Sequence, residues 1–225
     1  MGDETQLLIY GLGGFARELA WLIEQGGTDC GRPKPHLVGF VTDLDHKVGG
    51  CLLDLPILSL NSAKAQFPRA TVVGGIAEPA GREAAMLRAF SLGFRTVKII
   101  HPRVEISPRV RIGDGTVICA GVSITTDIEI GRHVQINPGS TVGHDVIIGD
   151  FTTLAPGSRI SGRVHLGKRV YIGAGAVVRD GTEERPIVIA DDAVVGASAC
   201  VLQDVPMRTT VIGVPARPMV RKNSV

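Results

Sequence analysis

Several features that identify other classes of protein are missing from this chain. Only 4% of its 225 residues are aromatic whereas 44% are hydrophobic, so we expect a core built from aliphatic side chains. The net charge of +2 gives no general electrostatic argument for binding nucleic acid. No apolar run of about 18 residues occurs, and residues 1–14 lack the charged and then apolar pattern of a signal peptide. We therefore expect no membrane insertion.

Cysteines are few and scattered. They are Cys30, Cys51, Cys119 and Cys200, and no CxxC pair is present. Reduced thiols in a cytoplasmic protein are the expectation from this spacing. The sequence gives no reason to assign a metal site.

The chain has instead a six-residue repeat that runs from Ile106 to Val178. Every sixth position in this range is Ile, Leu or Val, over thirteen consecutive positions. Chance does not supply such a run, because only about a quarter of ordinary residues belong to these types. The position after each aliphatic is small and often glycine, and the position four residues after each aliphatic is small or β-branched.

This repeat predicts a solenoid of short strands. The aliphatic side chains would point inward, and the small residues would allow tight corners. One coil cannot bury its own core, so coils stacked about 4.8 Å apart would form one continuous aliphatic column. The step from Val178 to Ile189 is longer than six residues, so we expect five inserted residues within 179–188 to loop out between coils.

The first hundred residues follow a different pattern, in which strands and helices alternate. We expect strands at 6–10, 37–41, near Ile57, at 71–73 and at 96–100, and helices at 15–25, 62–66 and after Pro79. This alternation predicts a small parallel α/β domain. His101 and Pro102 mark the junction, which gives expected domains of 1–101 and 102–225.

A glycine-rich turn follows the first predicted strand. Gly11, Gly13 and Gly14 precede Phe15 and the first helix, which is the context of a phosphate-binding turn. Asp43, at the end of the second strand, is placed to accept a hydrogen bond from a ribose hydroxyl. A purely structural turn and a nicotinamide dinucleotide site remain alternatives. A domain of about five strands lacks the second nucleotide-binding half, which favours a smaller nucleoside diphosphate ligand.

His144 stands out among the six histidines because of its expected neighbours. If one coil is three hexapeptides, residues 18 apart stack in columns: Thr126, His144 and Gly162 in one column, and Asp127, Asp145 and Arg163 in the next. Gly162 would let a ligand approach the backbone, and its N–H could face a developing oxyanion. Asp145 would strengthen His144 as a base, and Arg163 would keep Asp145 ionised. An ordinary salt-bridge ladder is the alternative.

A family resemblance rests on these features together. The glycine-loop α/β domain, the His101-Pro102 junction, the segment 136–150 around His144-Asp145 and the segment 189–196 resemble the NeuD/PglD-type sugar acyltransferases over nearly the whole chain. The resemblance implies an α/β N-terminal Rossmann-like domain followed by a left-handed parallel β-helix (hexapeptide repeat). It also implies a homotrimer and acyl transfer from a coenzyme A thioester.

The resemblance further implies roles for individual residues. His144 would be the general base, Asp145 the acidic neighbour that tunes it, and Gly162 a backbone contact to the thioester. Asn137 would help to hold the substrate beside the base. The loop from Gly11 to Phe15, with Asp43, would form the nucleotide-sugar pocket. The coenzyme A site would include Thr153, Gly162, Ala174, Ala197 and Arg217.

The chain also departs from the family pattern. Phe15 and Thr153 stand where many or some members carry histidine, so polar contacts from those positions are in question. Arg217, Arg221 and Lys222 would either neutralise coenzyme A phosphates or make the terminus soluble. Arg179 and Arg185 in the insertion would likewise either contact a phosphate or belong to a solvated loop.

We therefore expect a cytoplasmic acetyl-CoA-dependent N-acetyltransferase of glycan biosynthesis. Its substrate would be a UDP-, dTDP- or GDP-linked amino sugar, attacked directly with His144 as general base and without a metal or covalent intermediate. A sugar O-acetyltransferase is the first alternative. A γ-carbonic-anhydrase-like metal enzyme or a non-catalytic scaffold is the second, although His133, His144 and His165 are not closely spaced.

Overall fold

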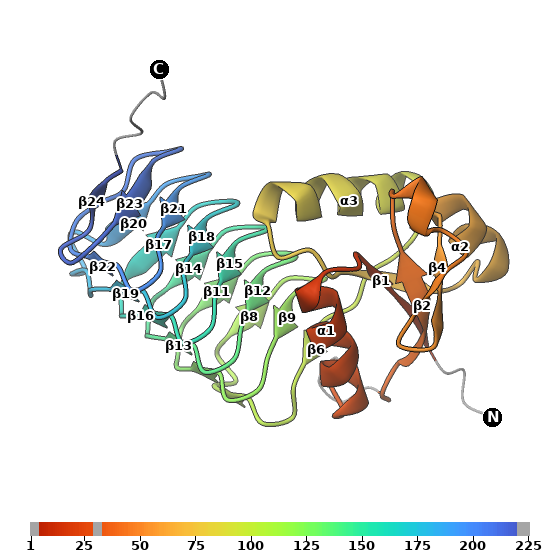
Figure 1. Ribbon diagram of the computed structural model, residues 1–225. Helices are drawn as coiled ribbons and strands as arrows, with labels where there is room; N and C mark the ends of the chain where they lie inside the picture. The colour runs from red at the N-terminus through yellow and green to blue at the C-terminus, as the bar shows by residue number, and fades with distance from the viewer. Residues whose placement is uncertain (1–4, 29–32, 220–225) are drawn as a thin grey trace, which may run out of the picture. The chain divides into compact units, whose positions relative to one another are not determined.

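The computed structural model describes residues 5–28 and 33–219, which form two compact units (Figure 1). The first unit comprises Met1–Pro102 with Asp114–Val117, and the second comprises Arg103–Gly113 with Ile118–Val225. The division falls one residue after the expected boundary and assigns a short later segment to the first unit. Cys30, Arg221 and Lys222, which entered the sequence predictions, lie outside the described residues.

The first unit is an α/β domain built on a five-stranded sheet. Its elements are β1 (Gln6–Tyr10), α1 (Gly14–Glu24), β2 (His36–Val41), a 3₁₀ turn (Asp45–Lys47), β3 (Cys51–Leu52), β4 (Leu55–Leu58), α2 (Leu60–Gln66), β5 (Thr71–Gly74), α3 (Pro79–Ser91) and β6 (Ile99–Ile100). The sheet order is β3-β4-β2-β1-β5, and only the β3–β4 pair is antiparallel. The predicted alternation of strands and helices is confirmed.

The fifth strand of this sheet differs from the prediction. The expected strand over 96–100 is reduced to β6, whose Ile99 amide donates to Thr116 at 3.0 Å, and β3 occupies the fifth place in the sheet. Leu53 and Asp54 form the two-residue turn between β3 and β4, both with positive φ (50° and 60°). Such turns usually carry Asn-Gly or Asp-Gly, so this pair gave no hairpin signal.

The strands of the first unit are buried where the sequence is continuously apolar. Leu7, Leu8 and Ile9 of β1 are fully buried, as expected for a central parallel strand covered on both faces.

Helix α3 begins at a cap made by the Glu78 carboxylate, which accepts from the amides of Ala80 (2.8 Å) and Gly81 (2.6 Å). Across the described part of the chain, no helix combines the length and apolar character needed to cross a membrane.

The second unit is a left-handed parallel β-helix with three faces. One face consists of β7 (Glu105–Ile106), β10 (Ser123–Ile124), β13 (Thr141–Val142), β16 (Arg159–Ile160), β19 (Val177–Val178) and β22 (Cys200–Val201). The next consists of β8 (Arg111–Ile112), β11 (Glu129–Ile130), β14 (Ile147–Ile148), β17 (Val164–Leu166) and β20 (Ile187–Ile189). The third includes β9 (Val117–Ile118), β12 (Gln135–Ile136), β15 (Thr153–Leu154), β18 (Tyr171–Ile172), β21 (Val194–Val195), β23 (Thr210–Ile212) and β24 (Arg217–Pro218).

Strands on successive coils pair in a constant register. Ser123 lies opposite Thr141, which lies opposite Arg159, a step of 18 residues per coil. Leu166 pairs with Ile189, which is five residues beyond that step. The prediction of three hexapeptides per coil and of a five-residue insertion is confirmed.

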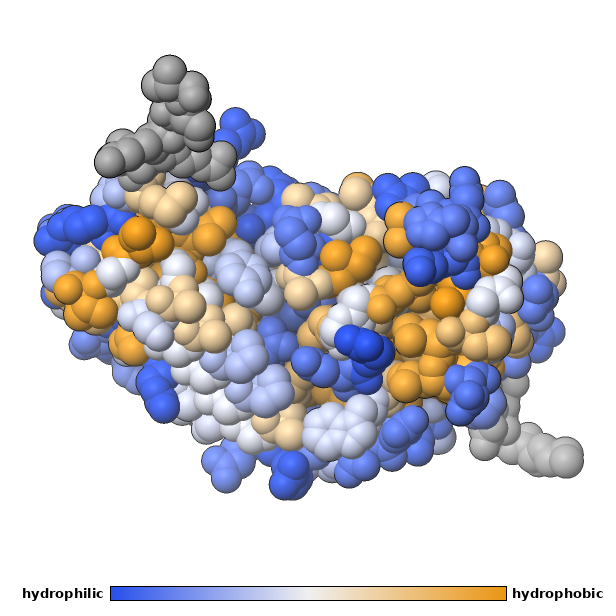
Figure 2. All heavy atoms as spheres, in the orientation of Figure 1, coloured by the Kyte–Doolittle hydropathy of each residue, from blue (hydrophilic) through white to orange (hydrophobic). Residues whose placement is uncertain are grey.

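The interior of the coil is made by both periodic sets of residues. From Ile118 to Val178, the repeated aliphatics are at most 4% exposed. The small or β-branched set also faces inward, and Ser140 Oγ there donates to the Ala155 carbonyl at 3.1 Å. Outward positions are mixed in polarity, and the visible surface in Figure 2 carries polar and apolar patches.

The glycines after the aliphatics serve coil stacking rather than turning. They have no positive φ, and a Cβ added to Gly149 would lie 2.5 Å from the backbone of Gly167 in the next coil. The corners lie two residues further on, where φ is positive at Asp145, Arg163 and equivalent positions. The expectation that these small residues allow the corners is therefore corrected: they allow close contact between coils.

Adjacent isoleucines on β14 test the assignment of inside and outside. Ile148 is 1% exposed and Ile147 is 42% exposed. We expect Ile148→Ala to lower the free energy of unfolding by about 2–5 kcal/mol because it leaves a cavity in the column. The matched control Ile147→Ala should change it by no more than about 0.5 kcal/mol. Urea denaturation measures both, and equal losses would contradict the assignment.

Candidate functional site

One corner of the β-helix brings together His144, the expected base, and the residues expected to surround it. His144 and Asp145 follow β13, and Gly162 and Arg163 follow β16 in the next coil. The Arg163 amide donates to the His144 carbonyl at 2.9 Å, and the Asp145 amide donates to the Thr126 carbonyl at 3.3 Å. The columns derived from the 18-residue step are therefore present.

His144 and Asp145 form a hydrogen-bonded pair. His144 Nδ1 lies 2.8 Å from Asp145 Oδ2, and each side chain is about half exposed. Arg163 Nη2 lies 3.9 Å from the same carboxylate oxygen. A carboxylate at Nδ1 fixes the proton on that nitrogen, which leaves Nε2 as the acceptor. The pair is thus arranged to accept a proton from a bound ligand at Nε2.

Gly162 lies against the imidazole of His144. A Cβ added to Gly162 would be 2.5 Å from His144 Cε1 and 2.6 Å from Nε2, so no side chain fits there. The Gly162 carbonyl accepts from the Gly181 amide at 3.0 Å. Within residues 5–28 and 33–219, the Gly162 amide has no hydrogen-bond partner. An amide without a partner, on a residue that packs against the imidazole, is a candidate donor to an oxygen that gains negative charge.

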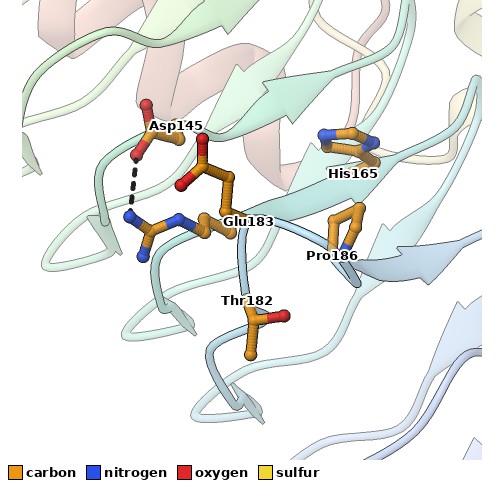
Figure 3. Close-up of a pocket in the computed structure, with 6 residues that line it drawn as sticks. Asp145, His165, Thr182, Glu183 and Pro186 are labelled. Carbon is orange, nitrogen blue, oxygen red and sulfur yellow. Dashed lines mark ion pairs between the residues drawn. The ribbon is translucent and has the colours of Figure 1, made fainter.

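Residues of the inserted loop line a cavity next to Asp145 (Figure 3). The cavity has a volume of about 320 Å³ and is lined by Asp145, Arg163, His165, Thr182, Glu183 and Pro186. Two backbone hydrogen bonds join the loop to the corner that follows β16. The Gly181 amide donates to the Gly162 carbonyl at 3.0 Å, and the Ile187 amide donates to the Arg163 carbonyl at 3.1 Å. The sequence predicted the insertion but not that it would flank this carboxylate.

The other expected β-helix residues lie at different positions. Asn137 is buried, and its Nδ2 donates to the Leu154 carbonyl at 2.9 Å. Asn137, Ala174 and Ala197 occupy the corner after the third face, whereas His144 occupies the corner after the first. Both alanines are exposed. A single chain therefore does not bring these residues together with His144.

Thr153 and Arg217 differ in accessibility. Thr153 on β15 is 1% exposed, so its hydroxyl does not face solvent in the isolated chain. Arg217 on β24 is exposed, and its Nη1 donates to the Ala216 carbonyl at 2.9 Å. Their assignment to a coenzyme A site stays a prediction.

The glycine turn of the first unit has the features of an anion site. Gly13 is the N-cap of α1, and no side chain caps that helix. A Cβ added to Gly13 or Gly14 would meet nothing within 4 Å, so the turn is open. Phe15 is buried in the core, so only its backbone amide remains for a ligand. The turn lies between β1 and α1, as expected, and the assignment of Phe15 to the nucleotide-sugar pocket stays a prediction.

Asp43 lies in a network that the sequence did not reveal. The Tyr10 hydroxyl donates to Asp43 Oδ1 at 2.5 Å, and Arg88 Nη2 donates to Asp43 Oδ2. Burial and the Asp43 hydrogen bond raise the pKa of Tyr10 to about 12. The Tyr10 and Asp43 hydrogen bonds raise the pKa of Arg88 above its usual value. Arg88 lies on α3, which follows β5. It reaches β1 and β2 because β5 lies next to β1 in the sheet.

In the described segments, no group of three or more His, Cys, Asp or Glu side chains is placed to hold a metal ion. His133 instead stacks on Phe151 with ring centroids 4.9 Å apart.

Comparisons with known proteins agree with this geometry. Residues 127–162 match the family model Bacterial transferase hexapeptide (six repeats). A GDP-perosamine N-acetyltransferase of Escherichia coli O157:H7 is 35% identical over 217 residues, which cover 95% of this chain and 96% of that protein.

Two solved structures are similar over almost the full length. WeeI from Acinetobacter baumannii AYE is 32% identical with a TM-score of 0.86, and the match covers 96% of this chain and 100% of that one. PerB from Caulobacter crescentus, in complex with CoA and GDP-perosamine, is 30% identical with a TM-score of 0.82, covering 96% and 97%.

A methyl group at Gly162 tests the packing of the imidazole. In Gly162→Ala we expect the ring to leave its place, because the new Cβ would lie 2.5 Å from Cε1. A crystal structure of the variant should show the His144–Asp145 hydrogen bond lengthened or broken, with the coil retained. Ser161→Ala, one residue away, is the control and should leave the pair in place. An unmoved imidazole in Gly162→Ala would contradict the packing described.

Proposed function

Because the chain belongs to the NeuD/PglD-type sugar acyltransferases, we propose that it transfers the acetyl group of acetyl-CoA to the amine of a GDP-linked amino sugar. The observation that carries the chemistry is the His144–Asp145 pair at 2.8 Å with Gly162 packed against the imidazole. The names of the relatives favour GDP and an amine acceptor over the other nucleotides and over a hydroxyl acceptor. Family membership also decides against a zinc hydrolase or a scaffold.

The proposed reaction is a direct transfer. The sugar amine attacks the thioester carbonyl carbon while His144 Nε2 accepts a proton from the nitrogen. Asp145 stabilises the resulting imidazolium, and the Gly162 amide donates to the oxyanion. When the intermediate collapses, the C–S bond breaks and the imidazolium returns its proton to the thiolate sulfur. A C–N bond replaces the C–S bond, and no covalent enzyme intermediate forms.

The nucleotide end of the substrate is assigned to the first unit. The open turn at Gly11, Gly13 and Gly14, with the uncapped N-terminus of α1, supports binding of the diphosphate. Asp43 supports binding of the ribose. The reaction is assigned to the cytoplasm, in keeping with the free cysteines Cys51, Cys119 and Cys200.

We further propose that the working enzyme is a homotrimer in which one subunit supplies His144 and the next supplies the coenzyme A corner. Support comes from the separation within one chain: Ala174 and Ala197 lie on a different corner from His144. A head-to-tail ring joins two different surfaces of identical subunits, so it can bring these corners together.

Loss of His144 tests the chemistry. Wild-type protein should release thiol from acetyl-CoA with a GDP-linked amino sugar faster than with UDP- or dTDP-linked amino sugars. His144→Ala should lower kcat by at least about a hundredfold, because general-base assistance contributes about 10²- to 10⁴-fold. His36→Ala, an exposed histidine at the start of β2, is the matched control and should be unchanged. Activity of His144→Ala within a few-fold of wild type would remove this residue from the mechanism, and transfer to a sugar lacking the amine would favour O-acetylation.

Mixed trimers test the shared site. His144→Ala and Ala197→Trp subunits, each inactive alone, should regain about a third of wild-type activity in trimers that contain both, since one of the three interfaces in such a ring joins two intact corners. Tandem affinity tags and thiol release measure this recovery. Trimers that contain both subunits and stay inactive would show that each chain uses its own corners.

A further inference from the structure

Three elements of the first unit meet at the Asp43 carboxylate. Tyr10 is the last residue of β1, Asp43 follows β2, and Arg88 is in the last turn of α3. Tyr10 donates to Oδ1, Arg88 donates to Oδ2, and Arg88 Nε donates to the Tyr10 hydroxyl at 3.3 Å. The Arg88 guanidinium also lies 5.9 Å from the centre of the Tyr10 ring. These contacts form a closed triangle of side chains.

The two donors remain donors under all ordinary conditions. The raised pKa of Tyr10, about 12, keeps its hydroxyl protonated, and the raised pKa of Arg88 keeps the guanidinium charged. A hydrogen bond between a charged group and its partner is stronger than a neutral one. The triangle therefore holds the Asp43 carboxylate in one orientation.

The carboxylate is still able to accept from a ligand. An ionised carboxylate has about four lone-pair sites, and Tyr10 and Arg88 occupy one site on each oxygen. The Asp43 side chain is 48% exposed, so the remaining sites can be reached from solvent. Without Arg88 and Tyr10, an exposed carboxylate would lose rotamer freedom on binding, which weakens affinity.

The triangle lies at the edge of the sheet where parallel α/β folds bind ligands. In the sheet, β1 lies between β2 and β5, so the strand order changes direction at β1, and ligands bind beyond the carboxyl ends of the strands at such a point. The Gly11 amide donates to the Val41 carbonyl at 2.9 Å, which ties the glycine turn to the end of β2. The carboxylate and the open glycine turn therefore belong to one edge of the first unit.

From this geometry we infer that Arg88 and Tyr10 are positioning residues that present Asp43 to the ribose 2′-hydroxyl of the nucleotide, so that the protein prefers ribonucleotides to 2′-deoxyribonucleotides. The inference rests on the proposed function only in taking a nucleoside diphosphate as the ligand of the first unit. It names the sugar of the nucleotide as a determinant of specificity and assigns a role to two residues outside the glycine turn.

Binding of GDP and UDP, each compared with its 2′-deoxy form, tests the inference without requiring catalysis. By calorimetry on the full chain, we expect wild type to bind at least one ribonucleotide about tenfold more tightly than its deoxy form. Asp43→Asn and Arg88→Met should reduce that ratio toward one by weakening the ribonucleotide, with little effect on the deoxynucleotide. Arg88→Lys and Tyr10→Phe should keep part of the ratio. Arg95→Met, an exposed arginine just after α3, should keep all of it.

Kinetics give a second readout. With the nucleotide-sugar substrate, Arg88→Met should raise KM for that substrate several-fold and leave kcat and the KM for acetyl-CoA unchanged. Equal weakening of ribo- and deoxynucleotides would assign Arg88 a merely structural role, and an unchanged ratio or no nucleotide binding by wild type would overturn the inference. A ratio that behaves as expected in a protein without acetyl transfer would reject the proposed function and leave this inference standing.

Discussion

Backbone pairing between successive coils is the constraint on which the second unit depends. Each two-residue strand is too short to be stable alone, and it persists because hydrogen bonds join it to the strands 18 residues before and after it. The 18-residue step determines which side chains stack on one another in successive coils. His144 therefore lies against Gly162, and Asp145 lies beside Arg163. The geometry of the acid–base pair is thus a property of the ladder rather than of the local corner. A rigid support of this kind is what precise positioning of a base requires.

The two units contribute differently to the proposed reaction. The β-helix corner supplies a proton acceptor and an amide donor but few groups that would grip a whole nucleotide sugar. The first unit has an open glycine turn and a fixed carboxylate, which suit the diphosphate and ribose. Binding energy from the part of a substrate that does not react can hold the reacting amine in place, which raises the rate by raising its effective concentration. In the proposed reaction, binding of the nucleotide therefore contributes to the rate as well as to the recognition of the substrate.

The fold was largely predictable because its determinants are periodic. The aliphatic repeat gave the core, the coil length and the column that joins His144 to Gly162, since stacking converts distance in sequence directly into distance in space. The first unit was predictable only where the signal was local, as in the glycine turn before α1. The β3–β4 hairpin was missed because Leu53 and Asp54 are not typical turn residues. The Tyr10–Asp43–Arg88 network was missed because it depends on sheet order.

The insertion between β19 and β20 shows where the β-helix can accept additional residues. The ladder resumes its register after five extra residues, and Gly181 sits at the neck of the loop, where a Cβ would lie 2.5 Å from the Arg163 carbonyl. Added length is therefore confined to a corner and leaves the core untouched. A corner can therefore carry extra residues beside the His144–Asp145 pair without a change in the register of the coils. Here the inserted loop borders Asp145, so its length and sequence can change beside that carboxylate while the coil beneath it stays the same.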